Sequence, residues 1–153
     1  QGPMPPVILA TDGSGLAGRA MVSAVALLGP DQRYVALSVV PPAFVPTASI
    51  GPMETHPTLV DPTLEAELDR EHRHDSAADL DDLEATLGVK TTHRVETGEP
   101  GVTICAVADE LDADLIVVGS HGHGWIQRVL MGSVSTHVLH HAPCPVMVMR
   151  AAE

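Results

Sequence analysis

The sequence has few positively charged residues and very few aromatic ones. Lys and Arg number 8 against 20 Asp and Glu, which gives a formal net charge of −12, and Lys90 is the single lysine. A chain with this balance repels a nucleic-acid backbone, so we expect no nucleic-acid partner. Any anionic ligand must be held by local donors rather than by the overall field. Aromatic residues make up 2% of the chain, so we expect a core of Val, Leu, Ile, Ala and Met.

Long hydrophobic runs and a secretory signal are also lacking. No apolar stretch approaches about 18 residues, the length typical of a membrane-spanning helix, so we expect a cytoplasmic protein with no membrane partner. Residues 1–3 look like a protease-site remnant added for expression, and residues 4–153 are expected to form a single domain. The two cysteines, Cys105 and Cys144, stand in apolar settings and are expected to be buried, reduced thiols rather than a disulfide or a nucleophile.

Short apolar runs alternate with helical patterns along the chain. Continuous apolar runs indicate strands that are buried on both faces, as in a parallel sheet. Ser14 suits the N-cap of the first helix, Gly29-Pro30 its end, and Pro100 the first turn of the third helix. The expected strands are residues 6–11, 33–40, 90–97, 113–120 and 145–150, and the expected helices are residues 14–29, 63–87, 99–112 and 133–141. This order predicts an α/β fold with an open five-stranded parallel sheet and four helices on both of its faces.

Residues 41–62 contain six prolines, which exclude a regular helix or a central strand. We expect a long excursion over the surface there. The helix that follows carries many acidic residues, which we interpret as a solvated face rather than a docking site. Five leucines fall near one face of that helix: Leu64, Leu68, Leu80, Leu83 and Leu87.

A glycine-rich segment follows the most hydrophobic of the first four expected strands. Its spacing is Gly119-x2-Gly122-x9-Gly132-Ser133, and Gly132-Ser133 opens a helix. Backbone amides at a helix N-terminus favour anions, and glycines let a backbone approach a phosphate closely. From spacing alone, a phosphate cradle and a simple connecting loop are equally open. Neither the P-loop pattern nor a G-x-G-x-x-G pattern after the first strand is present, so a dinucleotide site is not expected.

Three stretches taken together resemble the universal stress protein family. The glycine spacing resembles that family's nucleotide-binding motif, G-x2-G-x9-G-[ST]. The stretch "VILATDGS" resembles its first strand and aspartate, and "GSVSTHVLHHAPCPVMVMR" resembles its final helix and strand. The resemblance runs from Val7 to Arg150, with residues 41–62 as the family's variable, Pro-rich loop. It implies a sheet of order 3-2-1-4-5, as in adenine-nucleotide α-hydrolase-like folds. It also implies ATP binding, with cyclic AMP or another adenine nucleotide as the alternative and Mg²⁺ accompanying the nucleotide.

The resemblance also implies roles for single positions. Asp12 would contact the ribose, with Thr11 along the same edge, and Val39 would offer backbone groups to the adenine. Val118 and Gly119 would border the ribose, and the glycine-rich segment would hold the phosphates. The expected nucleotide-binding residues are Ala10, Thr11, Asp12, Val39, Val118, Gly119, His121, Gly122, Gly132, Ser133, Val134 and Ser135. No catalytic residue is expected: the resemblance implies a nucleotide sensor or regulator in the stress response, with at most slow ATP hydrolysis.

Histidines mark a departure from the family pattern. Many members carry arginines in the G-x2-G segment, where this chain has His121 and His123. If these rings touch phosphate, ATP affinity should rise as the pH falls through about 6.5. His137 and His141 have a helical spacing that can chelate zinc. No carboxylate or cysteine with matching spacing accompanies them, so we expect surface residues and no metal held by protein side chains.

The last strand, residues 146–150, is expected at the edge of the sheet, where unpaired N–H and C=O groups invite pairing. In the family this strand pairs with its copy across a two-fold axis, so we expect a symmetric homodimer. Two other functions stay open: an enzyme of the adenine-nucleotide α-hydrolase type, and a nucleotide-free dimeric interaction protein. The glycines at 119, 122 and 132 argue against the second of these.

Overall fold

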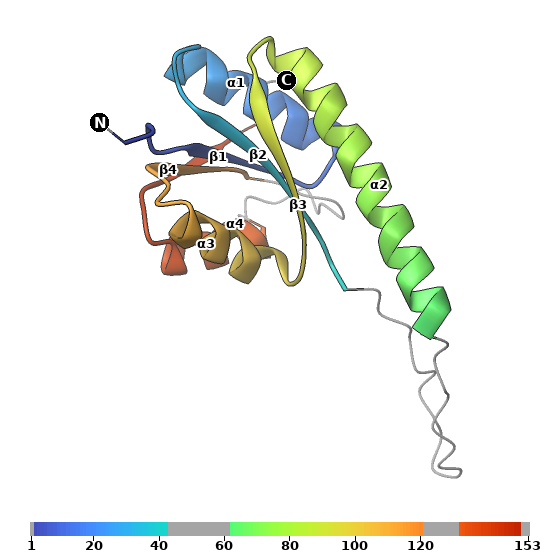
Figure 1. Ribbon diagram of the computed structural model, residues 1–153. Coiled ribbons are helices and arrows are strands. Elements are labelled where there is room, and N and C mark those ends of the chain that lie inside the picture. The colour runs from blue at the N-terminus through green and yellow to red at the C-terminus, as the bar shows by residue number, and fades with distance from the viewer. Residues whose placement is uncertain (1, 43–61, 121–131, 151–153) are drawn as a thin grey trace.

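The structure of the chain is a computed structural model that describes residues 2–42, 62–120 and 132–150. In chain order the elements are β1 (Val7–Thr11), α1 (Gly15–Leu28), β2 (Tyr34–Val40), α2 (Pro62–Leu87), β3 (Thr91–Thr97), α3 (Pro100–Glu110), β4 (Leu115–Gly119), α4 (Ser133–His141) and β5 (Val146–Met149). The strands form one parallel sheet of order β3-β2-β1-β4-β5 (Figure 1). The predicted α/β fold is confirmed.

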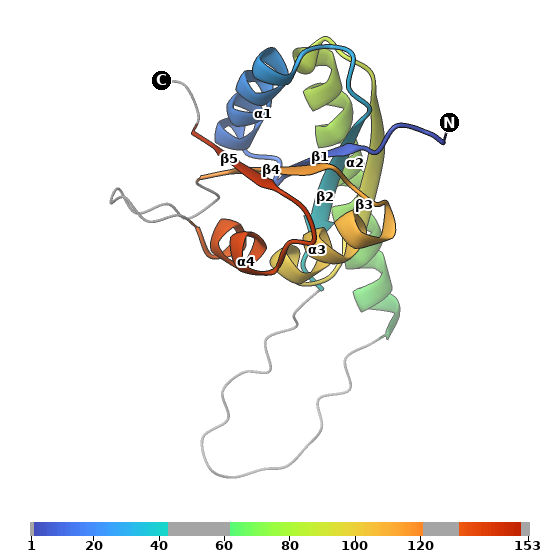
Figure 2. The ribbon, with the colours of Figure 1, turned by 90° about the vertical axis from the view of Figure 1, so that its left-hand side faces the viewer.

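The sheet is the middle of three layers, with α1 and α2 on one face and α3 and α4 on the other (Figure 2). Successive residues of β1 point to opposite faces. Leu9 belongs to the apolar cluster under α1 and α2, and Ile8 belongs to the cluster under α3 and α4. Both side chains are fully buried. Because helices cover both faces, a central strand must be apolar at every position, which is the pattern seen in the sequence.

The core is aliphatic with one aromatic exception. Its buried side chains are mostly Val, Ile, Leu, Ala and Met, as the composition predicts. Tyr34, at the start of β2, is also buried, and its hydroxyl donates a hydrogen bond of 2.6 Å to the carbonyl oxygen of Gly29. Burial raises the pKa of Tyr34. A buried tyrosine needs a partner for its hydroxyl, and here the end of α1 supplies it, which composition does not reveal.

The ends of α1 are set by local sequence. The Ser14 hydroxyl oxygen accepts a hydrogen bond of 3.1 Å from the amide of Ala17, which caps the first turn. Gly29 follows the helix with a φ of 87°, a left-handed conformation that glycine adopts without strain, and its amide bonds to the carbonyl oxygen of Val25. The predicted cap and the predicted end are both confirmed.

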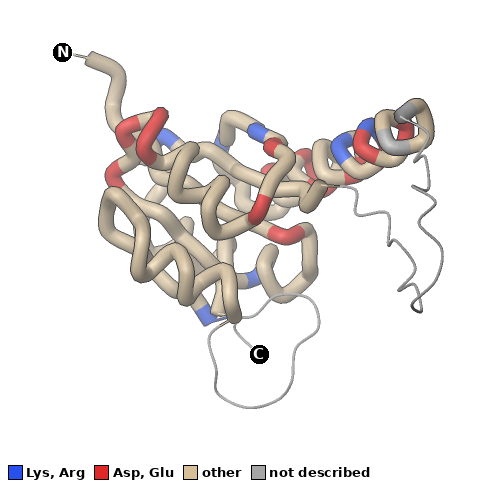
Figure 3. The backbone as a smooth tube through the Cα atoms, turned by 90° about the horizontal axis from the view of Figure 1, so that it is seen from below, with Lys and Arg blue, Asp and Glu red and all other residues tan. Residues whose placement is uncertain are grey.

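α2 is long and covers the sheet only with its C-terminal half. Leu80, Leu83 and Leu87 are buried in the first cluster, whereas Leu64 is 51% exposed. Figure 1 shows the N-terminal half extending beyond the sheet, and Figure 3 shows charged residues along it. The solvated face is confirmed, and Leu64 lies outside the core because the helix extends beyond the sheet. Of the helices in the described ranges, none combines the length and the apolar character that a membrane crossing requires.

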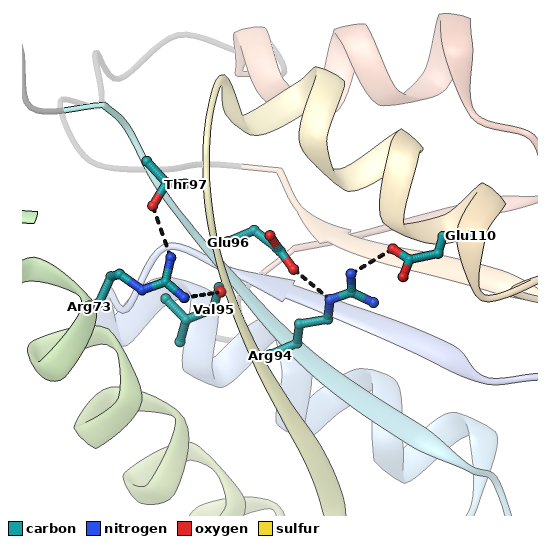
Figure 4. A network of polar contacts seen from close by, with 6 residues as sticks. All are labelled: Arg73, Arg94, Val95, Glu96, Thr97 and Glu110. Carbon is teal, nitrogen blue, oxygen red and sulfur yellow. Dashed lines mark hydrogen bonds and ion pairs between the residues drawn. The ribbon is translucent and has the colours of Figure 1, made fainter. Parts of the chain in front are cut away.

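β3 is an edge strand that polar contacts hold from both sides (Figure 4). Arg73 of α2 donates to the Thr97 hydroxyl at 3.2 Å and to a carbonyl oxygen of the same strand. Arg94 pairs with Glu96 at 2.7 Å and with Glu110 of α3 at 2.6 Å. α2 and α3 therefore fix a strand that has few apolar residues of its own.

Both cysteines are free, and both lie against the cluster under α3 and α4. Cys105 in α3 and Cys144 just before β5 are partly rather than fully buried. The expectation of buried thiols therefore holds only in part. Burial nevertheless raises the pKa of each thiol.

Candidate functional site

The carboxyl ends of β1 and β4 lie side by side where the strand order reverses. The two strands are hydrogen-bonded neighbours, with Leu9 opposite Val117. Beyond β1 the sheet continues to β2 and β3, and beyond β4 it continues to β5. The helices that leave these two ends, α1 and α4, go to opposite faces (Figure 2). In open α/β sheets ligands bind outside the carboxyl ends of the strands at this reversal, so we take the residues after both strands as the candidate site.

The first half of the site is the turn from β1 to α1. The amide of Gly13 donates to the Thr11 hydroxyl at 3.1 Å, and the amide of Ser14 donates to Asp12 Oδ1 at 2.9 Å. These bonds hold the predicted Thr11 and Asp12 at the edge, and Asp12 is exposed there. Ser14, not Asp12, caps α1. The carboxylate of Asp12 therefore stands on a fixed turn and is reachable from outside.

α2 contributes a carboxylate that the sequence did not indicate. Gly13 has a φ of 79°, and a Cβ atom built on it would lie 2.5 Å from Oδ2 of Asp79. The turn after β1 is thus packed closely against α2. Nothing in the local sequence signals this, because Asp79 lies in an acidic helix whose register on the sheet is set by Leu80, Leu83 and Leu87.

The second half of the site joins the end of β4 to the start of α4. The amide of Ser120 donates to the carbonyl oxygen of Met149 at 2.9 Å, which extends the pairing of β4 with β5. The carbonyl oxygen of Ser120 accepts from the amide of Gly132 at 3.2 Å. The first turn of α4 is therefore anchored beside the strand end, although the two are eleven residues, 121–131, apart in sequence.

The N-terminus of α4 has no side-chain cap from the residues that the structure describes. Its N-cap is Gly132, which forms no side-chain hydrogen bond, whereas α1 has the Ser14 cap. Ser133 is exposed, and the buried Ser135 donates its hydroxyl to the carbonyl oxygen of Gly132 at 3.0 Å. Uncapped first-turn amides carry partial positive charge and favour an anion. The predicted Gly132, Ser133 and Ser135 thus form an anion-favouring helix start.

The apolar residues among the predicted nucleotide-binding residues lie in strands and a helix beside the carboxyl ends of β1 and β4. Ala10 and Val118 are buried in the cluster under α3 and α4, and Val39 and Val134 are partly buried against it. Their side chains serve packing, so mainly their backbone groups are available to a ligand. The predicted Gly119 is the last residue of β4.

Some predicted residues lie outside the described ranges. These are His121 and Gly122, together with the neighbouring His123, and most of the Pro-rich segment. The pH effect expected from the histidines therefore stays a prediction.

The suggested zinc pair is in contact but has no third ligand. The ring centroids of His137 and His141 lie 4.4 Å apart on α4, with the planes tilted by 36°. Among the residues that the structure describes, no three His, Cys, Asp or Glu side chains are grouped as metal ligands. The interpretation of these histidines as surface residues stays the preferred one.

Comparison with known proteins links the chain and its fold to one family. A model described as the universal stress protein family matches residues 4–150. A universal stress protein from Synechocystis sp. is 41% identical over 63 residues, which make up 41% of this chain and 41% of that protein. A universal stress protein A-like protein from Arabidopsis thaliana is 39% identical over 64 residues, 42% of this chain and 37% of that protein. The matched segments thus span less than half of these curated relatives.

Solved structures resemble the chain over nearly its whole length. The universal stress protein UspA from Lactobacillus plantarum is 28% identical, with a TM-score of 0.72 over 98% of this chain and all of that one. A universal stress protein in complex with cAMP is 21% identical, with a TM-score of 0.62 and 97% and 98% coverage. A family protein from Arabidopsis thaliana with AMP bound is 20% identical, with a TM-score of 0.59 and 97% and 92% coverage. The last two likenesses establish the fold and nothing further.

Proposed function

The chain belongs to the universal stress protein family, and on this premise we propose that it binds an adenine nucleotide, ATP foremost, at the carboxyl edge of β1 and β4. The bound nucleotide would serve as a signal, so the protein acts as a sensor or regulator in the stress response rather than as an enzyme. Cyclic AMP is the alternative ligand. We propose that the protein works in the cytoplasm.

One observation carries the proposal: the described residues supply no reason for a glycine at position 132. Its φ is −60°, which any residue adopts, and the one described atom that a Cβ built on it would meet is Ser135 Oγ, at 3.9 Å. A side chain at this position would instead obstruct a ligand that approaches the first-turn amides of α4. A phosphate seated on those amides explains the glycine.

The remaining roles follow from the placement of each group. Asp12, exposed on the turn after β1, accepts hydrogen bonds from the ribose hydroxyls. Backbone groups of Val39, near the end of β2, lie on the side of β1 away from β4 and would meet the adenine. The first turn of α4 holds the phosphates with neutral donors, which suits a chain with a net charge of −12. Mg²⁺ enters with the nucleotide and shields the triphosphate.

Relatives support the choice of ligand class. A universal stress protein has been solved in complex with cAMP, another from Arabidopsis thaliana with AMP, and one from Archaeoglobus fulgidus with dAMP. All three ligands share adenine and a sugar phosphate, the chemistry that Asp12 and the α4 amides would recognise. We assign no catalytic residue, because Asp12 is proposed to hold the ribose rather than to act at the terminal phosphate.

We further propose a homodimer through β5. All four residues of this edge strand, Val146–Met149, are only partly buried in the single chain. Pairing of β5 with its copy would give hydrogen-bond partners to the backbone N–H and C=O groups on the open edge, and Arg150 would extend the contact.

The proposal is tested by mass spectrometry of the small molecules released when the purified protein is denatured. ATP among them supports the proposal, and cyclic AMP would redirect it to that ligand. An Asp12→Asn variant keeps an oxygen for the Ser14 amide but loses the charge, so it should fold normally and retain less nucleotide. Asp31→Asn is the matched control, because Asp31 is exposed in the turn after α1, away from the carboxyl edge. Equal nucleotide content in the two variants would contradict the role of Asp12.

A further inference from the structure

Ser120, the first residue after β4, has a hydroxyl without a hydrogen-bond partner among the described residues. The side chain is buried, with 7% of the residue exposed, and its Oγ atom is closed to solvent. Both of its backbone groups are bonded, the amide to Met149 and the carbonyl oxygen to the amide of Gly132. A buried hydroxyl with no partner is unfavourable, and such groups in folded proteins call for an explanation.

The position of Ser120 points its side chain toward the layer that contains α4. Side chains alternate along a strand, and Val118 belongs to the cluster shared with Val138 of α4. Ser120 continues the pairing of β4 with β5, so its side chain falls on the same face as Val118. The bond from Gly132 places the start of α4 next to it. The unpartnered hydroxyl therefore lies beside the uncapped first turn of the helix.

A comparison with Ser135 shows that this is not a general property of serines at the site. Ser135 is also buried, but its hydroxyl donates to the carbonyl oxygen of Gly132. The Ser135 hydroxyl therefore has an acceptor within the protein and needs no ligand to supply one. Ser120 is the buried serine at this helix start whose proton has no acceptor among the described residues.

We propose that the Ser120 hydroxyl is a phosphate donor, which reaches an oxygen of the nucleotide held on the first turn of α4. The inference rests on the proposed function and adds a contact to it. Rotation about χ1 moves a serine hydroxyl between staggered positions without moving the backbone, so the backbone bonds to Met149 and Gly132 stay in place. The contact adds a neutral donor to the amides, in a region where the described residues contribute the carboxylates of Asp12 and Asp79.

Two properties should change in opposite directions in a Ser120→Ala variant. Without ligand, the variant loses a buried, unpaired hydroxyl, so its melting temperature should equal or exceed that of the wild type. With ligand, it loses one hydroxyl–phosphate bond, so its affinity for ATP should fall about ten-fold. Adenosine has no phosphate, so its affinity should stay unchanged.

The experiment measures melting temperature and titrates ATP and adenosine into the wild type, Ser120→Ala, Ser120→Thr and a control, Ser23→Ala. Ser120→Thr keeps the hydroxyl and should retain most of the ATP affinity, and Ser23 lies on α1 away from the site. Equal ATP affinity in the wild type and Ser120→Ala would overturn the inference and leave the proposed function standing. A lower melting temperature with equal losses for ATP and adenosine would also overturn it, because that result indicates a structural role. A wild type that binds neither compound would overturn both proposals.

Discussion

The backbone amide of Gly132 donates a hydrogen bond of 3.2 Å to the carbonyl oxygen of Ser120. This contact holds the start of α4 beside the end of β4. The neighbouring strand β1 ends in the Asp12 turn, so a carboxylate and an uncapped helix start share one edge of the sheet. The proposed nucleotide site depends on this arrangement.

Gly132→Val should reduce ATP affinity while leaving the fold intact. The backbone at this position suits any residue, and the described residues leave room for a Cβ. The new side chain would instead displace the phosphate from the first-turn amides, and losing one such bond to a charged group weakens binding about 10- to 100-fold. Thermal shift measured with and without ATP reports both properties at once.

The matched control is Gly18→Val in α1, where a Cβ meets nothing within 4 Å and no ligand is proposed. It should keep the ATP-dependent shift. If Gly132→Val also kept the full shift, the phosphate would not lie on these amides.

Glu84 should make the fold more stable at neutral than at acidic pH. Its carboxylate accepts from the Thr91 hydroxyl at 2.7 Å and the Thr91 amide at 2.8 Å, and it lies 3.1 Å from Nε2 of His93. These contacts, the Thr91 hydroxyl foremost, lower the pKa of Glu84 below its ordinary value of 4.5. A carboxyl whose pKa is lowered by folding stabilises the fold above its unfolded pKa, and this contribution is lost as the pH falls through the folded pKa.

Urea unfolding of Glu84→Gln at pH 7 and near pH 3 tests this contribution. The variant should be less stable than the wild type at pH 7, and the difference should shrink at the acidic pH. Glu71→Gln, an exposed position on the same helix, should show neither effect. A constant difference between wild type and Glu84→Gln at both pH values would contradict the role assigned to the carboxylate.

Much of the fold follows from the sequence because local patterns decide it. The continuous apolar runs, the Ser14 cap and the Gly29 end are local signals, and each gave an element close to the one observed. The burial of Tyr34 and the exposure of Leu64 could not be predicted in this way, because each depends on which element covers the side chain. Tyr34 is covered at the end of α1, whereas Leu64 extends past the sheet.

Some residues of the candidate site could be predicted from local sequence, and others could not. The turn with Thr11 and Asp12 and the helix start at Gly132 carry motif residues, so the sequence indicates them. Asp79 and Ser120 belong to no such motif. They reach the site through tertiary packing, because α2 packs against Gly13 and the end of β4 lies beside the start of α4. A carboxylate within an acidic helix and a serine beside a glycine give no pattern of their own.

The thiols of Cys105 and Cys144 should react slowly in the folded protein. Burial raises the pKa of both, and the neighbouring Cys105 raises that of Cys144 further. Less thiolate is then present at neutral pH, so reaction with Ellman's reagent at pH 7 should be at least about ten-fold slower than in urea, and faster as the pH rises. Single Cys105→Ser and Cys144→Ser variants assign the rates. Rapid reaction of both thiols at pH 7 without denaturant would contradict their partial burial.

Val148→Pro should separate the proposed dimer. The carbonyl oxygens of Pro145 and Met149 accept bonds from β4. Since alternate residues of a strand direct their backbone groups to opposite sides, the amide of Val148 points to the open edge. Proline there removes a donor from the proposed dimer contact and leaves the bonds to β4 in place. Analytical ultracentrifugation should give a dimer for the wild type and a monomer for the variant.

Val148→Ala is the matched control, because it trims the side chain and keeps the amide. It should remain a dimer. A wild type that is monomeric at micromolar concentration would rule out the β5 contact, and a dimeric Val148→Pro would place the interface elsewhere.

The central claim is that this family member holds an adenine nucleotide at the edge formed by Asp12 and the start of α4. Calorimetric titration of ATP into wild-type protein stripped of small molecules tests it most directly. We predict saturable binding with one nucleotide per chain, which Asp12→Asn and Gly132→Val weaken and Asp31→Asn does not. Absence of binding to ATP, AMP and cyclic AMP at millimolar concentration, in protein that is folded, would contradict the account.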